Sequence, residues 1–185
     1  MAQEDLAKIK NIVKKLASAE DWQYHILPVL TYSRKLGKKL EADREVIELA
    51  ALLHDIGRLK YGDKDHHLTG AQEAEKILRK YNYPPALIRR VKHCIEAHRS
   101  QHGPRPKTIE AKVIANADGM VHFDILPLYF YWQAKKQNFN EALEWVEKKY
   151  QKSWNRKVTL PEARAMVREK YQTIKQILKW LRDIS

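Results

Sequence analysis

Apolar residues recur at the spacing of an α-helix along nearly the whole of this 185-residue chain. The clearest stripe lies in the C-terminal segment and consists of Leu160, Ala163, Val167, Tyr171, Ile174, Leu178 and Leu181. The same spacing, typical of one face of an amphipathic helix, relates Leu6, Ile9, Val13 and Leu16 near the start of the chain. No segment alternates apolar and polar residues as a half-buried strand does. The sequence therefore predicts an all-α fold.

Length and composition limit the class of protein further. A chain of this length with 44% apolar residues can bury one core, so we predict a single domain over residues 1–185. Cys94 is the only cysteine, which excludes an internal disulfide and a cysteine-based zinc site. The charged start of the chain lacks the apolar stretch of a signal peptide. No apolar run approaches the ~20 residues that span a bilayer, so we expect a cytoplasmic protein with no membrane partner.

Positive charge is concentrated in the last third of the chain. The formal net charge is +12, and residues 126–185 contribute +7 of it, with 13 Lys and Arg against 6 Asp and Glu. A basic surface attracts anions such as nucleotides and nucleic acids. The same composition is equally typical of a solvated helix surface rich in lysine. Charge alone leaves both interpretations open.

The stretch AALLHDIGRLK, residues 50–60, places an imidazole and a carboxylate directly after an apolar run. These groups are His54 and Asp55, and Asp118 lies within a second apolar helix, AKVIANADGM. An ionised carboxylate in a helical core costs free energy unless a cation or hydrogen-bond donors compensate it. Together with His25, these side chains either converge on a divalent cation or lie apart as separate surface and hydrogen-bonded residues. Spacing alone does not decide between the two.

Several motifs in a fixed order resemble one protein family. The motifs LLHDIGR, HHLTGA, IEAHR and IEAKVIANADGM follow His25 in this order. Together they resemble the HD-domain metal-dependent phosphohydrolases, and most closely the small stand-alone HDIG-type members. The resemblance covers about residues 22–124. It implies an HD-domain-like helical bundle with a metal-binding core over residues 20–125 and additional C-terminal helices.

The resemblance implies roles for particular residues. The ligands of the primary metal would be His25, His54, Asp55 and Asp118. Two further histidines of the family are matched by His66 and His98, which would bind either a second metal, bridged by Asp55, or the phosphate of the substrate. This donor set suits Mn, Fe, Co, Ni or Zn, and less decisively Mg, with one or two ions per chain. Asp55 would also act in catalysis by orienting the attacking water.

Cationic residues near these motifs are candidates for binding phosphate. Arg58 lies one helical turn after the aspartate of the HD pair and offers a planar fork to phosphate oxygens, so we predict a catalytic role for it, with an ordinary exposed charge as the alternative. Lys64 and Arg99 are candidates for substrate binding at the same anion-binding rim, with solvent exposure as the alternative. We expect His102 and His122 to be ordinary surface or supporting residues.

We therefore expect a phosphohydrolase that cleaves a phosphate ester or anhydride of a small phosphorylated substrate, plausibly a nucleotide, through a metal-activated water. The alternative is a non-catalytic basic helical module that binds nucleotide or nucleic acid and uses its metal for structure. Residues 126–185 lie outside the resemblance and interleave Trp, Tyr and Phe with Lys, as nucleic-acid-binding surfaces do. A helical stripe through Leu143, Val146 and Tyr150 instead favours packing on the core, with a pocket wall or a homodimer surface as further roles.

Overall fold

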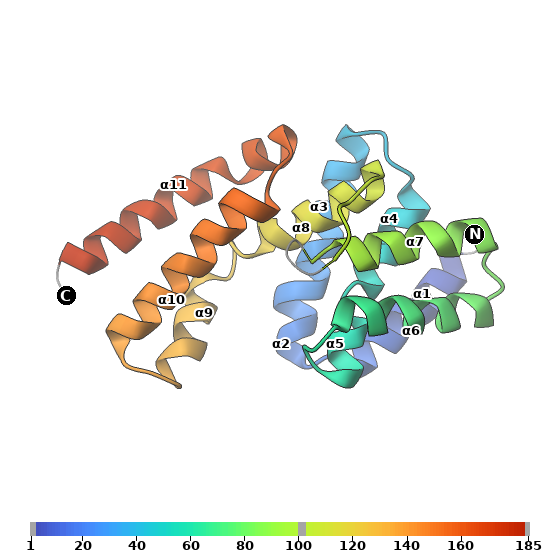
Figure 1. The fold of residues 1–185 in the computed structure, drawn as a ribbon, viewed down its shortest axis with the longest axis horizontal. Coiled ribbons are helices and arrows are strands. Elements are labelled where there is room, and N and C mark those ends of the chain that lie inside the picture. Colours follow the sequence, from blue (N-terminus) through green and yellow to red (C-terminus); the bar gives the residue numbers. More distant parts are fainter. Residues whose placement is uncertain (1–2, 100–102, 184–185) are drawn as a thin grey trace.

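The computed structural model describes residues 3–99 and 103–183, which form helices and no strand (Figure 1). The all-α fold is thereby confirmed. Within these ranges no helix is both long enough and apolar enough to cross a membrane. In chain order the elements, with two π-helical segments labelled η, are α1 (Gln3–Leu16), α2 (Ala19–Asp21), η1 (Trp22–Ile26), α3 (Leu27–Lys39), α4 (Arg44–Leu53), α5 (Ile56–Tyr61), α6 (His66–Lys80), α7 (Pro85–Ala97), α8 (Ile109–Val121), α9 (Leu126–Ala134), α10 (Phe139–Lys152), η2 (Ser153–Lys157) and α11 (Pro161–Asp183).

Side-chain caps fix the start of three helices on which the rest of the structure depends. Asp43 caps α4 by accepting hydrogen bonds from two backbone N–H groups of its first turn. Thr108 caps α8 by accepting from the N–H of Ala111. Asn138 and Glu141 form a capping box at the start of α10. The caps set the register of α4, α8 and α10, and each of these helices leads to residues of the pocket described below.

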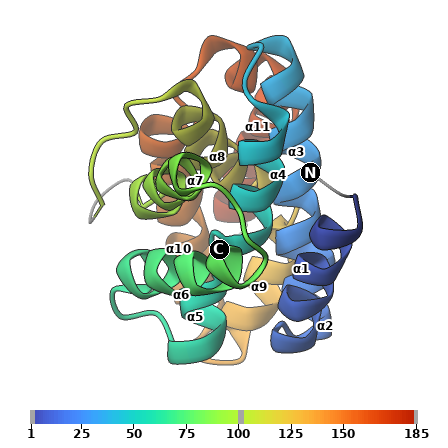
Figure 2. The same cartoon turned by 90° about the vertical axis from the view of Figure 1, so that its right-hand side faces the viewer.

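Helix α8 lies between two groups of helices. Figure 1 shows α1 to α7 on one side of it and α9 to α11 on the other. It contacts α3, α4 and α7 in the first group, and η2 and α11 in the second. Apart from Lys112, every residue from 110 to 121 is buried, which explains why the helix is apolar almost all round. Figure 2 shows α7 and α8 beside α3 and α4, with the C-terminal helices behind them.

Aromatic side chains pack the C-terminal group together and against the end of α8. Trp154 stacks on Tyr171 with ring centroids 3.9 Å apart, and Tyr150 stacks on the same ring at 5.1 Å. Phe123, just after α8, meets Tyr150 edge-on at 5.1 Å. Such pairs stabilise a fold by about 0.5–1.5 kcal/mol each beyond the area they bury. These aromatic residues of the C-terminal segment therefore serve packing, while the limits 20–125 and 126–185 stay predictions.

Candidate metal centre and its pocket

Interruptions in regular α-helix position three of the predicted ligands. His25 lies in η1, a π-helical segment that precedes α3, and π-helical turns occur frequently at functional sites. His54 and Asp55 lie in the break between α4 and α5, directly after the buried end of α4. Asp118 comes from the middle of the buried helix α8. Three separate segments therefore deliver these four side chains to one place.

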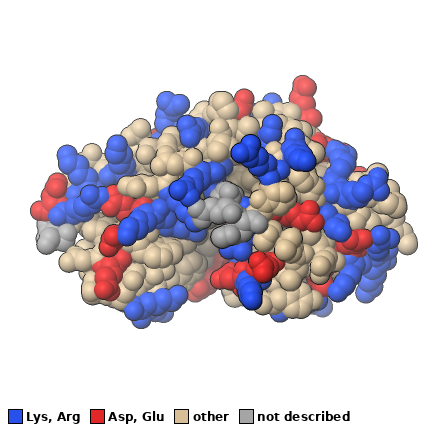
Figure 3. Space-filling model, in the orientation of Figure 1, with Lys and Arg blue, Asp and Glu red and all other residues tan. Residues whose placement is uncertain are grey.

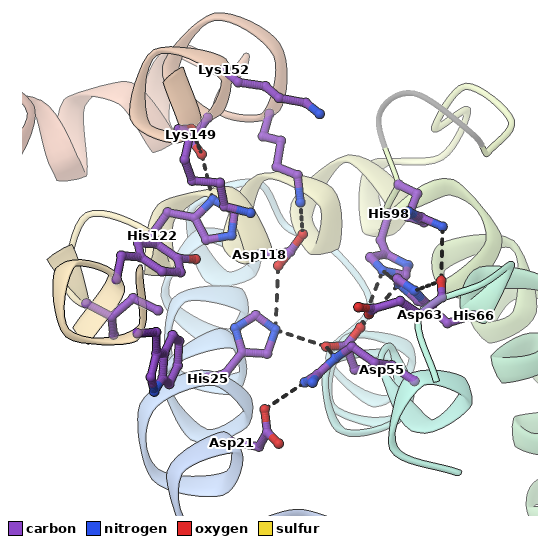
Figure 4. A pocket seen from close by; sticks show the side chains of 17 residues that line it. Asp21, His25, Asp55, Asp63, His66, His98, Asp118, His122, Lys149 and Lys152 are labelled. Carbon is purple, nitrogen blue, oxygen red and sulfur yellow. Dashed lines mark hydrogen bonds and ion pairs between the residues drawn. The ribbon is translucent and has the colours of Figure 1, made fainter. Parts of the chain in front are cut away.

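The four predicted ligands of the primary metal meet around the ring of His25 (Figure 4). Its Nε2 lies 3.1 Å from Nε2 of His54, 3.2 Å from Oδ2 of Asp55 and 3.6 Å from Oδ1 of Asp118. Neighbouring ligand atoms of one cation are about 3 Å apart when each lies about 2.1 Å from it. Among the described residues, the ligand atoms of His25, His54 and Asp55 all lie within 4.8 Å of one another, a spacing that fits a single divalent cation. Asp118 lies outside this group of three and approaches the cluster through His25.

A second cluster shares Asp55 with the first. Its other oxygen, Oδ1, lies 3.5 Å from Nε2 of His66 and 3.7 Å from Nε2 of His98, and these two nitrogens are 3.2 Å apart. Helices α5 and α6 pack backbone to backbone here. A Cβ at Gly57 would lie only 2.2 Å from the carbonyl oxygen of His66, so this contact has no room for a side chain. The structure thus brings all six predicted residues together. Their roles as ligands stay predictions, and the arrangement accommodates one ion or two.

Backbone carbonyls fix the direction of three imidazoles. Nδ1 of His54, His66 and His98 lies 2.9, 3.1 and 2.6 Å from the carbonyl oxygen of the residue three positions earlier. A carbonyl oxygen only accepts, so each Nδ1 donates its proton and each Nε2 presents a lone pair to the cluster. Burial lowers the pKa of His54 to about 4, which keeps its ring neutral near pH 7. Neutral imidazoles with free Nε2 atoms are the form that binds metal.

Both carboxylates of the site are buried and ionised. Burial opposes the ionisation of Asp55, but the neighbouring histidines, His54 foremost, hold the pKa of its carboxyl well below the usual value. For Asp118 the same cost of burial is overcome chiefly by Lys157, whose ammonium donates to Oδ2 and holds the pKa well below the usual value. Oδ1 of Asp118 is thereby left to face His25. Lys157 was not predicted, because it lies on η2, outside the motifs.

Arg58 points into the site and is held by two carboxylates. Its Nε donates to Oδ2 of Asp55 at 2.8 Å, and one Nη donates to Oδ1 of Asp21 at 2.9 Å. Burial disfavours the guanidinium charge, but Asp55 and Asp21 raise the pKa of Arg58 above its ordinary value. Arg58 therefore supports Asp55 directly, and a contact with phosphate would use its remaining N–H groups.

A cavity of about 410 Å³ opens beside the two clusters. Arg99 lines it, with Nη1 3.4 Å from the carbonyl oxygen of Asp63. Lys64 is exposed on the loop before α6 and is not among the lining residues. His102 lies outside the described residues. The opposite wall is basic and aromatic and includes Tyr129, Trp132, Lys149, Lys152 and Lys157.

His122, which the sequence led us to expect as an ordinary surface or supporting residue, lines the pocket. It is buried, and its Nδ1 lies 2.6 Å from Oγ of Ser153, whose hydroxyl donates to the carbonyl oxygen of Lys149 at 2.9 Å. The Ser153 proton is therefore used, so Nδ1 of His122 is the donor and Nε2 is left as an acceptor. Burial, followed by the charges of Lys149 and Lys157, lowers the pKa of His122 well below its usual value. The available signal was its spacing of four residues from Asp118, which places both on one helix face.

Comparison with known proteins gives the same assignment as the motifs. The sequence model of the HD domain family matches residues 22–120. A tRNA (cytidine(56)-2'-O)-methyltransferase of Picrophilus torridus is 32% identical over 110 residues, which are 54% of this chain and 31% of that protein. An uncharacterized protein of Methanocaldococcus jannaschii is 31% identical over 132 residues, which are 63% of this chain and 75% of that one. The chain thus spans about a third of the methyltransferase and three quarters of the second relative.

Two solved structures share the whole fold. An HD-superfamily hydrolase of Bacillus thuringiensis has a TM-score of 0.73 at 20% identity, covering 98% of this chain and 97% of its own. YpgQ of Bacillus subtilis, solved in complex with ADP, has a TM-score of 0.69 at 21% identity, covering 98% and 95%. At this level of identity the likeness shows the fold. Because it covers nearly the whole chain, it includes the C-terminal helices as well as the bundle.

Proposed function

Because the chain belongs to the HD domain family, we propose that it is a divalent-metal-dependent phosphohydrolase that cleaves a phosphate ester or anhydride of a nucleotide. The observation that carries the proposal is the position of Asp55. Its two oxygens face two histidine clusters, and the same residue lines a pocket that also contains cationic side chains. A purely structural metal site has no need of an open, cationic cavity beside it.

The residues present fit a divalent cation, which His25, His54, Asp55 and Asp118 would hold, with His66 and His98 as ligands of a second ion or as contacts to phosphate. When bound, such a cation supplies Lewis-acid polarisation of a phosphoryl oxygen and lowers the pKa of a coordinated water from 15.7 to about 7.

The protein's own groups would place the water and the substrate. Ionised Asp55 can accept a hydrogen bond from the attacking water and so orient it. Arg58 keeps that carboxylate in place and offers further N–H groups to phosphate oxygens. The wall that includes Tyr129 and Trp132 offers aromatic surface to a nucleobase. The ADP complex of YpgQ, which shares the fold, supports a nucleotide as substrate.

The test is metal analysis followed by a screen of nucleotides and model phosphodiesters with Mn, Co, Ni and Mg. We expect hydrolysis by the metal-loaded protein and its loss in Asp55→Ala, with Asp5→Ala, a change of the same kind on α1 and away from the pocket, as the matched control. If the loaded protein hydrolysed none of these compounds while Asp55→Ala still bound nucleotide or nucleic acid, the alternative of a non-catalytic binding module would replace this proposal. A homodimer and a cytoplasmic location stay predictions.

A further inference from the structure

The wall of the pocket opposite the two histidine clusters is formed by residues that follow the HD domain match. The match ends at residue 120, whereas Lys149, Lys152 and Lys157 lie on α10 and η2. Figure 4 shows Lys149 and Lys152 extending from α10 on the side of the pocket away from Asp55. Figure 3 shows Lys and Arg side chains bordering the middle of one face, where the two groups of helices meet. The pocket therefore combines an imidazole and carboxylate wall with a cationic wall.

The cations of this second wall differ in their partners. Lys157 is neutralised by Asp118. Among the described residues, neither Lys149 nor Lys152 has a carboxylate within ion-pair distance, and Lys149 instead lies over the ring of Tyr129, with Nζ 5.6 Å from the centroid. Two ammonium groups thus line the pocket without an ion-pair partner among the described residues, although the charges of Asp118 and Asp55 also act on Lys149.

Holding these ammonium groups together is unfavourable without an anion. Burial, followed by the charges of Lys157 and Lys152, lowers the pKa of Lys149 to about 8. Lys149 is half-buried in this wall, whereas Lys152 is exposed at its rim. An anion with several oxygen atoms, such as a phosphate group, would bind both ammonium groups through charge-assisted hydrogen bonds. The arrangement is that of a binding site for phosphate.

This inference rests on the proposed function, because it adds a second phosphoryl group to a substrate whose first phosphorus reacts beside Asp55. We propose that Lys149 and Lys152 bind a second phosphoryl group of the substrate, joined through an anhydride oxygen to the group that reacts beside Asp55. The preferred substrate is therefore a phosphoanhydride, such as a nucleoside diphosphate or triphosphate, and not a phosphate monoester.

The hydrolysis balances as follows. The oxygen of water forms a bond to the reacting phosphorus, the bond from that phosphorus to the anhydride oxygen breaks, and the electron pair stays on the anhydride oxygen. The two protons of the water are shared between the phosphate products and the solvent. The leaving phosphate gains negative charge beside Lys149 and Lys152, so the two lysines stabilise the transition state as well as the bound substrate.

Calorimetric titration of the full chain, loaded with Mn, tests the subsite with two probes: orthophosphate and methylenediphosphonate, a diphosphate analogue that cannot be hydrolysed. In the wild-type protein we expect the diphosphonate to bind at least roughly tenfold more tightly, as a second charge-assisted contact provides. The double variant Lys149→Gln, Lys152→Gln should lose most of this preference. Its affinity for orthophosphate should stay within about threefold of wild type, because that anion binds beside the metal ligands.

Three controls identify the cause of any change. Lys148→Gln alters an exposed neighbour on the same helix that pairs with Glu144, and it should keep the full preference. Lys149→Arg should retain much of it, since the charge remains. Metal content, measured by mass spectrometry, should be the same in every variant.

Equal affinity of the wild-type protein for both probes would overturn the inference, and so would an unchanged preference in the double variant. Tighter binding of a dinucleotide phosphodiester than of the diphosphonate would do the same and would favour nucleic acid. A lysine-dependent preference without hydrolysis of any compound in the screen would keep the subsite and overturn the proposed hydrolase. Hydrolysis without the preference would do the reverse.

Discussion

The two walls of the pocket are held in place by different means. On the histidine wall, Nδ1 of three imidazoles donates a hydrogen bond to a backbone carbonyl one turn earlier, which fixes the orientation of each ring. On the cationic wall, Lys149 and Lys152 reach the pocket on long side chains with no ion-pair partner among the described residues. The first wall is preorganised and the second can adapt. Under the proposed function, the reaction chemistry would reside in the rigid half, and recognition of the substrate in the half that can vary.

Asp55→Ala should break the rigid wall most completely, because both clusters lose an oxygen donor at once. We expect bound metal to fall to background and kcat for phosphoanhydride hydrolysis to fall by on the order of 10³, as when a principal transition-state interaction is removed. Metal analysis and steady-state kinetics measure both. Retention of full metal occupancy would show that Asp55 is not a ligand.

Gly119→Ala should displace the cationic wall, and Lys157 with it, away from α8. A Cβ at this position would lie 2.6 Å from Cβ of Lys157 and 3.1 Å from Cγ2 of Val158, so η2 must move away from α8. Overpacking of this kind costs about 1–3 kcal/mol. Thermal unfolding should therefore occur roughly 2–4 °C lower for each kcal/mol lost.

The control for Gly119→Ala is a substitution on the same helix at a position that faces solvent. Lys112→Ala, at the exposed position of α8, should leave the melting temperature nearly unchanged. Metal affinity should also fall in Gly119→Ala, because Lys157 moves with η2 away from Asp118. An unaltered melting temperature in Gly119→Ala would mean that η2 does not pack on α8 as closely as described.

Lys157→Met tests the ion pair with Asp118, which joins the two walls. Removing the ammonium frees Oδ2 of Asp118 and lets the carboxylate turn, so we expect metal affinity to fall roughly tenfold, the lower end of effects seen for partners of metal ligands. Competition with a fluorescent chelator measures the affinity. Lys157→Arg should restore most of it, while Arg156→Met, an exposed neighbour, should have no effect. Tighter metal binding in Lys157→Met would reverse the role assigned to this lysine.

Lys149→Met should give the smallest effect, and one that depends on pH. The pKa of Lys149 is about 8 in the folded protein and 10.5 as its ordinary value. The unfolded chain therefore binds more protons between these values, and folding carries the cost of a buried charge in full only below about pH 8. At pH 7 and without ligand, Lys149→Met should be more stable than wild type by on the order of 1 kcal/mol, after allowance for solvent screening. Denaturant unfolding should show this gain disappearing towards pH 10.5, and a gain independent of pH would point to packing alone.

The sequence predicted the rigid wall far better than the cationic one, for physical reasons. Metal chemistry needs particular residue types at fixed places, so the resemblance carried by several motifs in a fixed order indicated a site, which the His-Asp pair alone did not. The sequence did not predict that His25 lies in a π-helical segment, because apolar periodicity does not distinguish such a turn from an α-helix.

The cationic wall had no comparable signal. Lys148 and Lys149 are adjacent and chemically identical, yet one is exposed on the surface and the other lines the pocket. The difference depends on how α10 docks beside the end of α8, which is a tertiary contact. Lys64 and Arg99 illustrate the same limit, since two cations near the motifs have different positions relative to the cavity.

Helix α8 carries Asp118 into one wall and ends beside His122 in the other, and the HD domain match stops within it, at residue 120. One inserted residue in an α-helix turns everything after it by about 100°. Recombination that gives this bundle a new C-terminal half can therefore keep Asp118 and His122 in their places only if it joins the two halves beyond His122. Among descendants of such exchanges, the length of α8 should be inherited unchanged while the helices after it diversify, so that new substrates are acquired without alteration of the metal ligands.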